Sequence, residues 1–235
     1  MVKTPNEQLA RLGKRPRRII EQVVRDRLTT NEAVQELFFD NSHPTSVTRN
    51  TARLCATGWL CSFPLIYPTK YFRLGKRAAS AFGLTLHATY PLGPQALPTE
   101  YAILRYTSSN HHHVQRLTSH ELLNLQPWSQ PRWLNAPHCI RRESEKSLVE
   151  LLRVDLGAPA DHLARKCQSD INDRYFADDF RTLLSRGAFQ LVVITGSTQK
   201  AAQIDAALSA HNWPDGMLFR IAVFTDLIPL LPRSF

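Results

Sequence analysis

A cluster of hydroxyl and guanidinium side chains follows His43 and has the chemistry needed to bind nucleic acid. In "HPTSVTRNTARLCATGWL" the cluster consists of Thr45, Ser46, Thr48, Arg49 and Arg53. An arginine donates two parallel hydrogen bonds to a guanine edge or a phosphate, and a small hydroxyl both donates and accepts at base edges. No acidic residue lies between Asn41 and Ala96 to repel a phosphate. We therefore expect these side chains to contact DNA bases and phosphates.

A helix beginning at Pro44 would place this cluster on one side. Proline suits the first helical position, and Gly58 is a suitable stop. At 100° per residue, Val47, Thr51, Leu54 and Cys55 fall on one side, while Ala52 joins Thr45, Ser46, Arg49 and Arg53 on the other. The pattern predicts a helix with one buried face and one polar face.

Two further helices are expected before it and a β-hairpin after it. Helical spacing of apolar residues runs through "RRIIEQVVRDRL" and "NEAVQELFF", and Thr29 precedes Glu32 at a capping-box distance. The segments "WLCSFPLI" and "KYFRL" read as strands joined by "YPT". This order is typical of a winged helix-turn-helix, with the third helix in the major groove. On and after the second strand, phosphate contacts are expected from Lys70, Arg73, Lys76 and Arg77.

The charge distribution favours a polyanionic partner. The chain has 29 basic and 20 acidic residues, and residues 1–100 hold 14 and 7 of them. Nucleic acid and an anionic membrane surface both fit this excess. No apolar run is long enough to span a membrane, and the N-terminal segment lacks the apolar core of a secretory signal, so we expect a cytoplasmic protein with no membrane partner. The four cysteines lack the paired spacing of a zinc site.

A second domain is expected after a proline-rich connector at residues 86–99. We predict a DNA-binding domain over residues 1–88 and an α/β domain over residues 97–235. "YAILRY" reads as a strand and residues 111–125 as a helix, and strands and helices then alternate to the end of the chain. The predicted fold class is α+β, with a mixed sheet in the second domain.

Short motifs resemble a known family. "GWL" after the third helix and "YFRLGKRAASAFGL" after the hairpin resemble the winged-helix half of the replication-relaxation family, which occurs on plasmids and other mobile elements. The second half of the chain resembles that family's degenerate restriction-endonuclease-like domain of the PD-(D/E)XK type. The resemblance implies a DNA-binding protein whose nuclease fold has lost its activity.

The resemblance also shows where a metal site would lie. Pro137-His138 stands where that fold has Pro-Asp, and Arg153 stands near the position of a second acidic ligand. Mg²⁺ needs oxygen ligands, usually several carboxylates, so this arrangement would bind it poorly. We expect no catalytic residue, metal or cofactor. Whether a residual site forms is left open for four other residues, Asp155, Lys166, Glu121 and Glu150.

The sequence therefore predicts a sequence-specific binder of double-stranded DNA, acting as a transcriptional regulator or as a replication or transfer accessory factor. A homodimer on a palindromic site is expected, because one winged helix reads only a few base pairs. The second domain is a possible platform for a protein partner. Two alternatives stay open: a Mg²⁺-dependent nuclease guided by the winged helix, and a module that only docks proteins.

Overall fold

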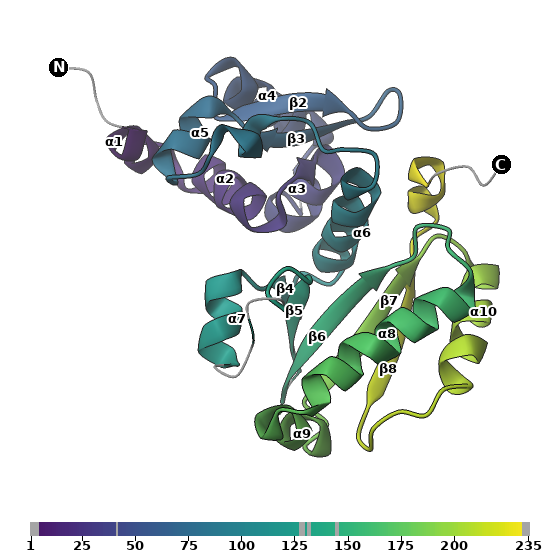
Figure 1. Cartoon of the computed structure of the whole chain (residues 1–235). Helices are drawn as coiled ribbons and strands as arrows, with labels where there is room; N and C mark the ends of the chain where they lie inside the picture. Colours follow the sequence, from purple (N-terminus) through teal and green to yellow (C-terminus); the bar gives the residue numbers. More distant parts are fainter. Residues whose placement is uncertain (1–4, 41, 127–129, 131–132, 144–145, 232–235) are drawn as a thin grey trace. The chain divides into compact units, whose positions relative to one another are not determined.

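The structure is a computed structural model that describes residues 5–40, 42–126, 130, 133–143 and 146–231. The chain divides into two compact units, residues 1–109 and residues 110–235. The fold is α+β with a mixed sheet, as predicted, and the sheet has five strands and belongs to the second unit. Figure 1 shows the elements of both units.

The first unit contains the expected helices and hairpin. In chain order its elements are α1 (Pro5–Ala10), α2 (Lys14–Asp26), β1 (Thr29–Thr30), α3 (Asn31–Phe38), α4 (Pro44–Ala56), β2 (Leu60–Pro64), β3 (Lys70–Leu74), α5 (Lys76–Ala81), the 3₁₀ turn η1 (Leu86–Thr89) and α6 (Ala96–Ser109). Strands β2 and β3 form an antiparallel hairpin, and β1 pairs with the other edge of β3. Strand β3 is therefore the central strand of a small sheet.

An apolar core holds α2, α3, α4 and the hairpin together. Ile20 and Val23 of α2, Val34 of α3, Leu54 of α4 and Phe72 of β3 all belong to one buried cluster. The helical spacing of these residues in the sequence brings one face of each helix to this core. The N-cap of α3 is Thr30, whose side chain accepts a hydrogen bond from the Ala33 amide, rather than Thr29.

Helix α6 corrects two sequence predictions. "YAILRY" is helical rather than extended, and its helix belongs to the first unit rather than to a domain beginning at residue 97. Glu100 accepts a hydrogen bond from Arg27, and Arg105 donates to Glu36 at 3.1 Å. Leu104 is fully buried in a cluster with Leu28 and Tyr71. The boundary between the units therefore falls after Ser109.

The second unit is a mixed sheet with its helices on one face. Its elements are β4 (Val114–Arg116), α7 (Ser119–Leu125), β5 (His138–Arg142), β6 (Ser147–Val154), α8 (Ala160–Tyr175), α9 (Asp178–Ser185), β7 (Phe189–Thr195), α10 (Thr198–Ser209), β8 (Leu218–Val223) and the 3₁₀ turn η3 (Thr225–Leu230). Residues 111–113 form a turn before β4, so the helix expected over residues 111–125 is present only at Ser119–Leu125.

The sheet has the strand order β4-β5-β6-β7-β8. Strand β5 is antiparallel to both of its neighbours, β4 and β6, whereas β6, β7 and β8 run parallel to one another. Alternate residues of β6 and β7, including Val149, Leu151, Leu191 and Val193, pack in one core with apolar residues of α7, α8, α9 and α10. All seven residues of β7 are buried, which accounts for its nearly continuous apolar sequence.

Candidate nucleic-acid interface

Helix α4 begins with a well-defined cap. His43 is its N-cap, and the His43 Nδ1 accepts a hydrogen bond from the Thr45 amide at 3.3 Å. The Thr45 hydroxyl lies 2.9 Å from the same nitrogen. Pro44 occupies the first turn, where its missing amide proton costs no helical hydrogen bond. The first turn of α4 is thus fixed locally, with Thr45 exposed at its start.

The buried face of α4 holds the helix against the rest of the first unit. Val47, Thr51 and Leu54 are each at most 2% exposed. The Thr51 hydroxyl donates to Asn31 Oδ1 at 3.0 Å and so ties the middle of α4 to the first residue of α3. A polar residue is tolerated on this face because its hydroxyl has hydrogen-bonding partners.

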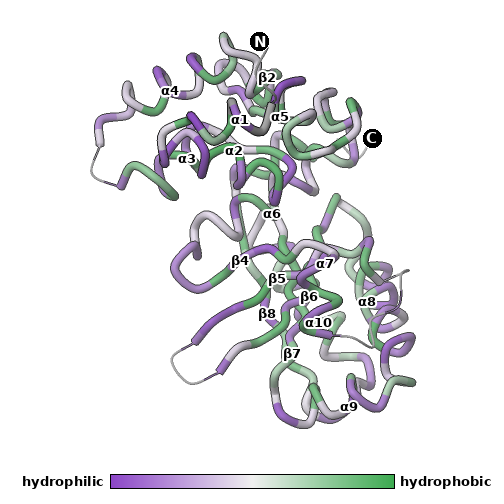
Figure 2. The backbone as a smooth tube through the Cα atoms, turned by 90° about the vertical axis from the view of Figure 1, so that its left-hand side faces the viewer, coloured by the Kyte–Doolittle hydropathy of each residue, from purple (hydrophilic) through white to green (hydrophobic). Residues whose placement is uncertain are grey.

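The opposite face of α4 carries the side chains expected to bind DNA. Thr45, Thr48, Arg49 and Arg53 are exposed, and Ser46 is half-buried. Between the arginines the helix presents Ala52, whose small exposed side chain leaves room for close approach. Figure 2 shows hydrophilic and hydrophobic residues alternating along α4, as its two faces require. The predicted exposure is found for Thr45, Arg49 and Arg53 but only in part for Ser46, and their contact with DNA stays a prediction.

The two arginines of α4 differ in their surroundings. Arg53 donates to Asn50 Oδ1 at 3.4 Å, a long and exposed hydrogen bond. Arg49 has no hydrogen bond or ion pair with any residue that the structure describes. The Thr48 hydroxyl donates to the Pro44 carbonyl at 3.4 Å. None of these weak contacts would compete strongly with a phosphate or a base edge.

Three of the four basic residues expected beside the hairpin are exposed. Lys70 opens β3, and Lys76 and Arg77 open α5. Arg77 donates to the Thr57 carbonyl at 2.8 Å, and its guanidinium lies 5.6 Å from the centre of the Trp59 ring. That pair of contacts fixes Arg77 near the C-terminal end of α4.

Arg73 is the exception and corrects the sequence prediction. It is only 3% exposed. Its guanidinium donates to the backbone carbonyls of Arg27 and Tyr90. Burial, and then the neighbouring charge of Arg27, lower the pKa of the Arg73 guanidinium. Arg73 is therefore a structural residue and is not placed to contact a phosphate.

Further exposed cations lie on and before α2, where sequence reasoning named none. Arg15 and Arg18 stack over the rings of Phe39 and Phe38 at 4.4 and 5.1 Å from the ring centres. Arg11 and Lys14 are also exposed. The segment "RLGKRPRR" shows these basic residues in the sequence, but the prediction for this helix used only the spacing of its apolar residues.

The residues considered for a nuclease site do not converge. Glu150 is fully buried, and its carboxylate accepts a hydrogen bond from Arg141 at 2.7 Å. His138 is paired in register with Leu151, so it lies on the opposite face of the sheet from Glu150. Arg153, on β6, forms an ion pair with Asp170 of α8.

The other candidates of that site have structural partners. Asp155 is 2% exposed and accepts hydrogen bonds from the Thr195 hydroxyl at 2.9 Å and the Gly157 amide at 3.0 Å. Glu121 closes the capping box of α7 with Thr118. Lys166 is exposed on α8. Within the described part of the chain, no group of three His, Cys, Asp or Glu side chains is arranged to hold a metal ion.

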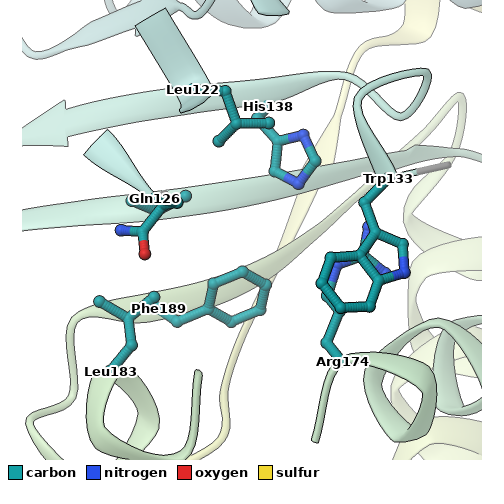
Figure 3. Close-up of a pocket in the computed structure, with 8 residues that line it drawn as sticks. Leu122, Gln126, Trp133, His138, Arg174, Leu183 and Phe189 are labelled. Atoms are coloured by element: carbon teal, nitrogen blue, oxygen red, sulfur yellow. The ribbon is translucent and has the colours of Figure 1, made fainter. Parts of the chain in front are cut away.

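His138, which stands where the resembled nuclease fold has an Asp ligand, lines a small cavity. His138, Trp133, Arg174 and Phe189 surround a space of about 10 Å³, room for at most one water molecule (Figure 3). The His138 Nδ1 lies 2.8 Å from the Ala136 carbonyl and therefore donates to it. Burial, with the nearby charge of Arg174, lowers the pKa of His138 to about 3. A neutral imidazole in so small a space is a core residue.

A scan against models of protein families, a search of curated proteins and a search of solved structures each found no match to this chain. Among the helices in the described ranges, none combines the length and apolarity needed to cross a bilayer.

Proposed function

We propose that the protein is a sequence-specific binder of double-stranded DNA and that its first unit is a winged helix-turn-helix. In this proposal α4 enters the major groove, and the β2–β3 hairpin forms the wing. The observation that carries the proposal is the exposed face of α4. It presents two arginines and small hydroxyl residues in a segment free of acidic residues, on a helix whose other face is buried in the core.

The order and packing of the elements favour this role for α4. Helix α3 is linked to α4 by the Asn31–Thr51 hydrogen bond, and α4 leads through Gly58 directly into β2. A groove-reading helix must be held rigidly by neighbouring elements so that its side chains meet the base edges in one register. Lys70, Lys76 and Arg77 supply exposed charge beside it for phosphates.

The second unit has an accessory role in the proposal. Its buried Arg141–Glu150 pair, its neutral His138 and its engaged Asp155 give no observation that favours Mg²⁺-dependent cleavage. A degenerate restriction-endonuclease-like domain of this kind would serve as a homodimer surface or a platform for a protein partner. Action on a mobile element, in regulation, replication or transfer, is proposed on the resemblance of "GWL" and "YFRLGKRAASAFGL" to the replication-relaxation family.

The test begins with the recovery of a binding site. The full chain is used to select duplexes from a randomised library, and affinities for the selected site and a scrambled site are measured by fluorescence anisotropy. Arg49→Ala and Arg53→Ala should each weaken binding to the selected site by about 5- to 150-fold, as expected for the loss of a bidentate base contact. Their affinity for the scrambled site should change much less.

Arg165→Ala is the matched control, because Arg165 is an exposed arginine on α8 in the second unit. It should leave both affinities within twofold of the unchanged protein. The proposal is wrong if the α4 variants retain both the affinity and the site preference of the unchanged protein.

A further inference from the structure

The tip of the β2–β3 hairpin has an unusual composition for an exposed turn. It reads "LIYPT", and Tyr67 is 97% exposed. Pro68 beside it is exposed as well. Turns ordinarily use Gly, Pro, Asn, Asp or Ser, so Pro68 is an ordinary turn residue and the exposed Tyr67 is the unusual one. The apex therefore offers an aromatic ring and a pyrrolidine ring to the surroundings.

The tip is held in shape by its own hydrogen bonds. The Leu65 amide donates to the Thr69 carbonyl at 3.1 Å, and the Thr69 amide donates to the Ile66 carbonyl at 2.6 Å. The Thr69 hydroxyl also donates to the Ile66 carbonyl at 2.5 Å. These bonds close the turn between Ile66 and Thr69, so Tyr67 and Pro68 are left at the apex.

The base of the hairpin is anchored in the first unit. Tyr71 of β3 is 2% exposed, its hydroxyl accepts a hydrogen bond from the Leu92 amide at 3.0 Å, and its ring lies 5.5 Å from that of Phe63 on β2. The loop between β2 and β3 extends beyond the strands in Figure 1. Tyr67 is thus an apolar group on a short, well-anchored arm.

We propose that Tyr67 enters the minor groove beside the site read by α4 and wedges its ring between adjacent base pairs, with Pro68 supporting it. This inference rests on the proposed function. Apolar side chains inserted at a base step unstack it and kink the duplex, and an aromatic ring recovers part of the stacking energy. Lys70, exposed at the start of β3, adds positive charge to the arm, and the surrounding segment has no acidic residue. Both properties suit a polyanionic partner such as DNA, and the exposed ring of Tyr67 adds a group that can stack on a base.

The wedge would add specificity that hydrogen bonds do not provide. Pyrimidine–purine steps such as TA and CA unstack more easily than other steps. Tyr67 would therefore favour sites with such a step at the flank of the sequence contacted by α4.

The test uses the full chain with the selected site. In a series of duplexes, one adenine at a time is replaced by 2-aminopurine, whose fluorescence rises when it is unstacked. The unchanged protein should raise the emission several-fold at one flanking step. Tyr67→Ala should abolish that rise and weaken binding about tenfold, while Tyr67→Phe, which keeps the ring, should retain both. Thermal melting should be unchanged, because a side chain so exposed makes little contribution to the core.

Tyr90→Ala is the matched control, since Tyr90 is a 53% exposed tyrosine of the same unit outside the hairpin. It should leave emission and affinity as they are. No rise in emission with the unchanged protein at any position, or an equal rise with Tyr67→Ala, would overturn the wedge. Loss of site preference in Arg49→Ala and Arg53→Ala alongside either result would leave the proposed function standing. Retained affinity and retained site preference in those variants would remove the proposed function itself.

Discussion

At the scale of single residues, His138 shows how burial determines what a side chain can do. Its residue type would allow acid–base or metal chemistry, but it lies in the core, 4% exposed, with a pKa lowered to about 3 by burial and by the charges of Arg174 and Arg153. A histidine exposed in the unfolded chain titrates near its ordinary value of about 6.5. The difference links protonation of His138 to the stability of the second unit.

The sign of this linkage follows from which state binds the proton. Between pH 6.5 and pH 3 the unfolded chain is protonated at His138 and the folded chain is not, so acidification favours unfolding. At pH 5 the cost is about 2 kcal/mol for a shift of this size. The free energy of unfolding of the unchanged protein should therefore fall between pH 7.5 and pH 5 by about 2 kcal/mol more than that of His138→Gln, as measured by urea denaturation.

His162→Gln provides the comparison, because His162 is exposed on α8. The free energy of unfolding of His162→Gln should change with pH as that of the unchanged protein does. Identical pH dependences for His138→Gln and the unchanged protein would show that His138 is not buried in its neutral form.

The burial or exposure of the candidate interface residues could be predicted where it follows helix periodicity. It could not be predicted where it depends on a tertiary contact. The spacing in "HPTSVTRNTARLCATGWL" correctly gave Val47, Thr51 and Leu54 as buried and Arg49 and Arg53 as exposed. Arg73 was wrongly expected at the surface. Its guanidinium is held by carbonyls 46 and 17 residues away in the chain, and no local pattern reports such contacts.

At the scale of elements, amphipathic segments were predicted well, and a helix that is buried along most of its length was not. Helix α6 is buried at Tyr101, Ala102, Ile103, Leu104 and Tyr106, which leaves almost no polar face to show a helical period. A short apolar run rich in aromatic residues fits a buried strand equally well. The strand assignment then moved the expected domain boundary, because α6 was counted with the second domain.

The junction between α4 and the hairpin depends on a close approach of two glycines. A Cβ on Gly75 would lie 2.2 Å from the Gly58 carbonyl oxygen and 2.7 Å from its carbon, both backbone atoms. The Gly75 amide donates to the Trp59 carbonyl at 2.8 Å, and the Arg77 amide donates to the Gly58 carbonyl at 3.2 Å. These contacts set where α4 ends relative to β2 and the start of α5.

Gly75→Ala should therefore force this junction apart. Overpacking against backbone typically costs about 1–3 kcal/mol, so the free energy of unfolding should fall by that amount in urea denaturation. Site-specific DNA binding should weaken as well, since α4 and the hairpin would no longer hold their native arrangement.

Gly93→Ala tests whether the effect belongs to the junction. Gly93 is exposed, and a Cβ there would meet nothing within 4 Å. The free energy of unfolding of Gly93→Ala should therefore differ from that of the unchanged protein by less than about 0.5 kcal/mol. Equal stabilities of the two variants would contradict the close approach at Gly58.

At the scale of the whole molecule, positive charge is concentrated in the first unit. Residues 1–109 contain 15 basic and 7 acidic residues, whereas residues 110–235 contain 14 and 13. The net charges are therefore +8 and +1, which together give the +9 of the chain. The unit that carries α4 and the hairpin is thus the one to which a polyanion is attracted, and the nearly neutral second unit would add little electrostatic affinity.

This asymmetry predicts a salt dependence that only the first unit controls. Each phosphate contact releases counterions and adds about 0.9 to the slope of log affinity against log salt concentration. If Lys70, Lys76 and Arg77 each neutralise one phosphate, binding should weaken about 40-fold between 50 and 200 mM salt. Lys70→Ala and Lys76→Ala should each reduce the slope by about 0.9 for both the selected and the scrambled site, because phosphate contacts do not depend on sequence. Lys166→Ala, an exposed lysine of the second unit, should leave the slope unchanged. If removing Lys166 instead had the larger effect, DNA would have to bind mainly through the second unit.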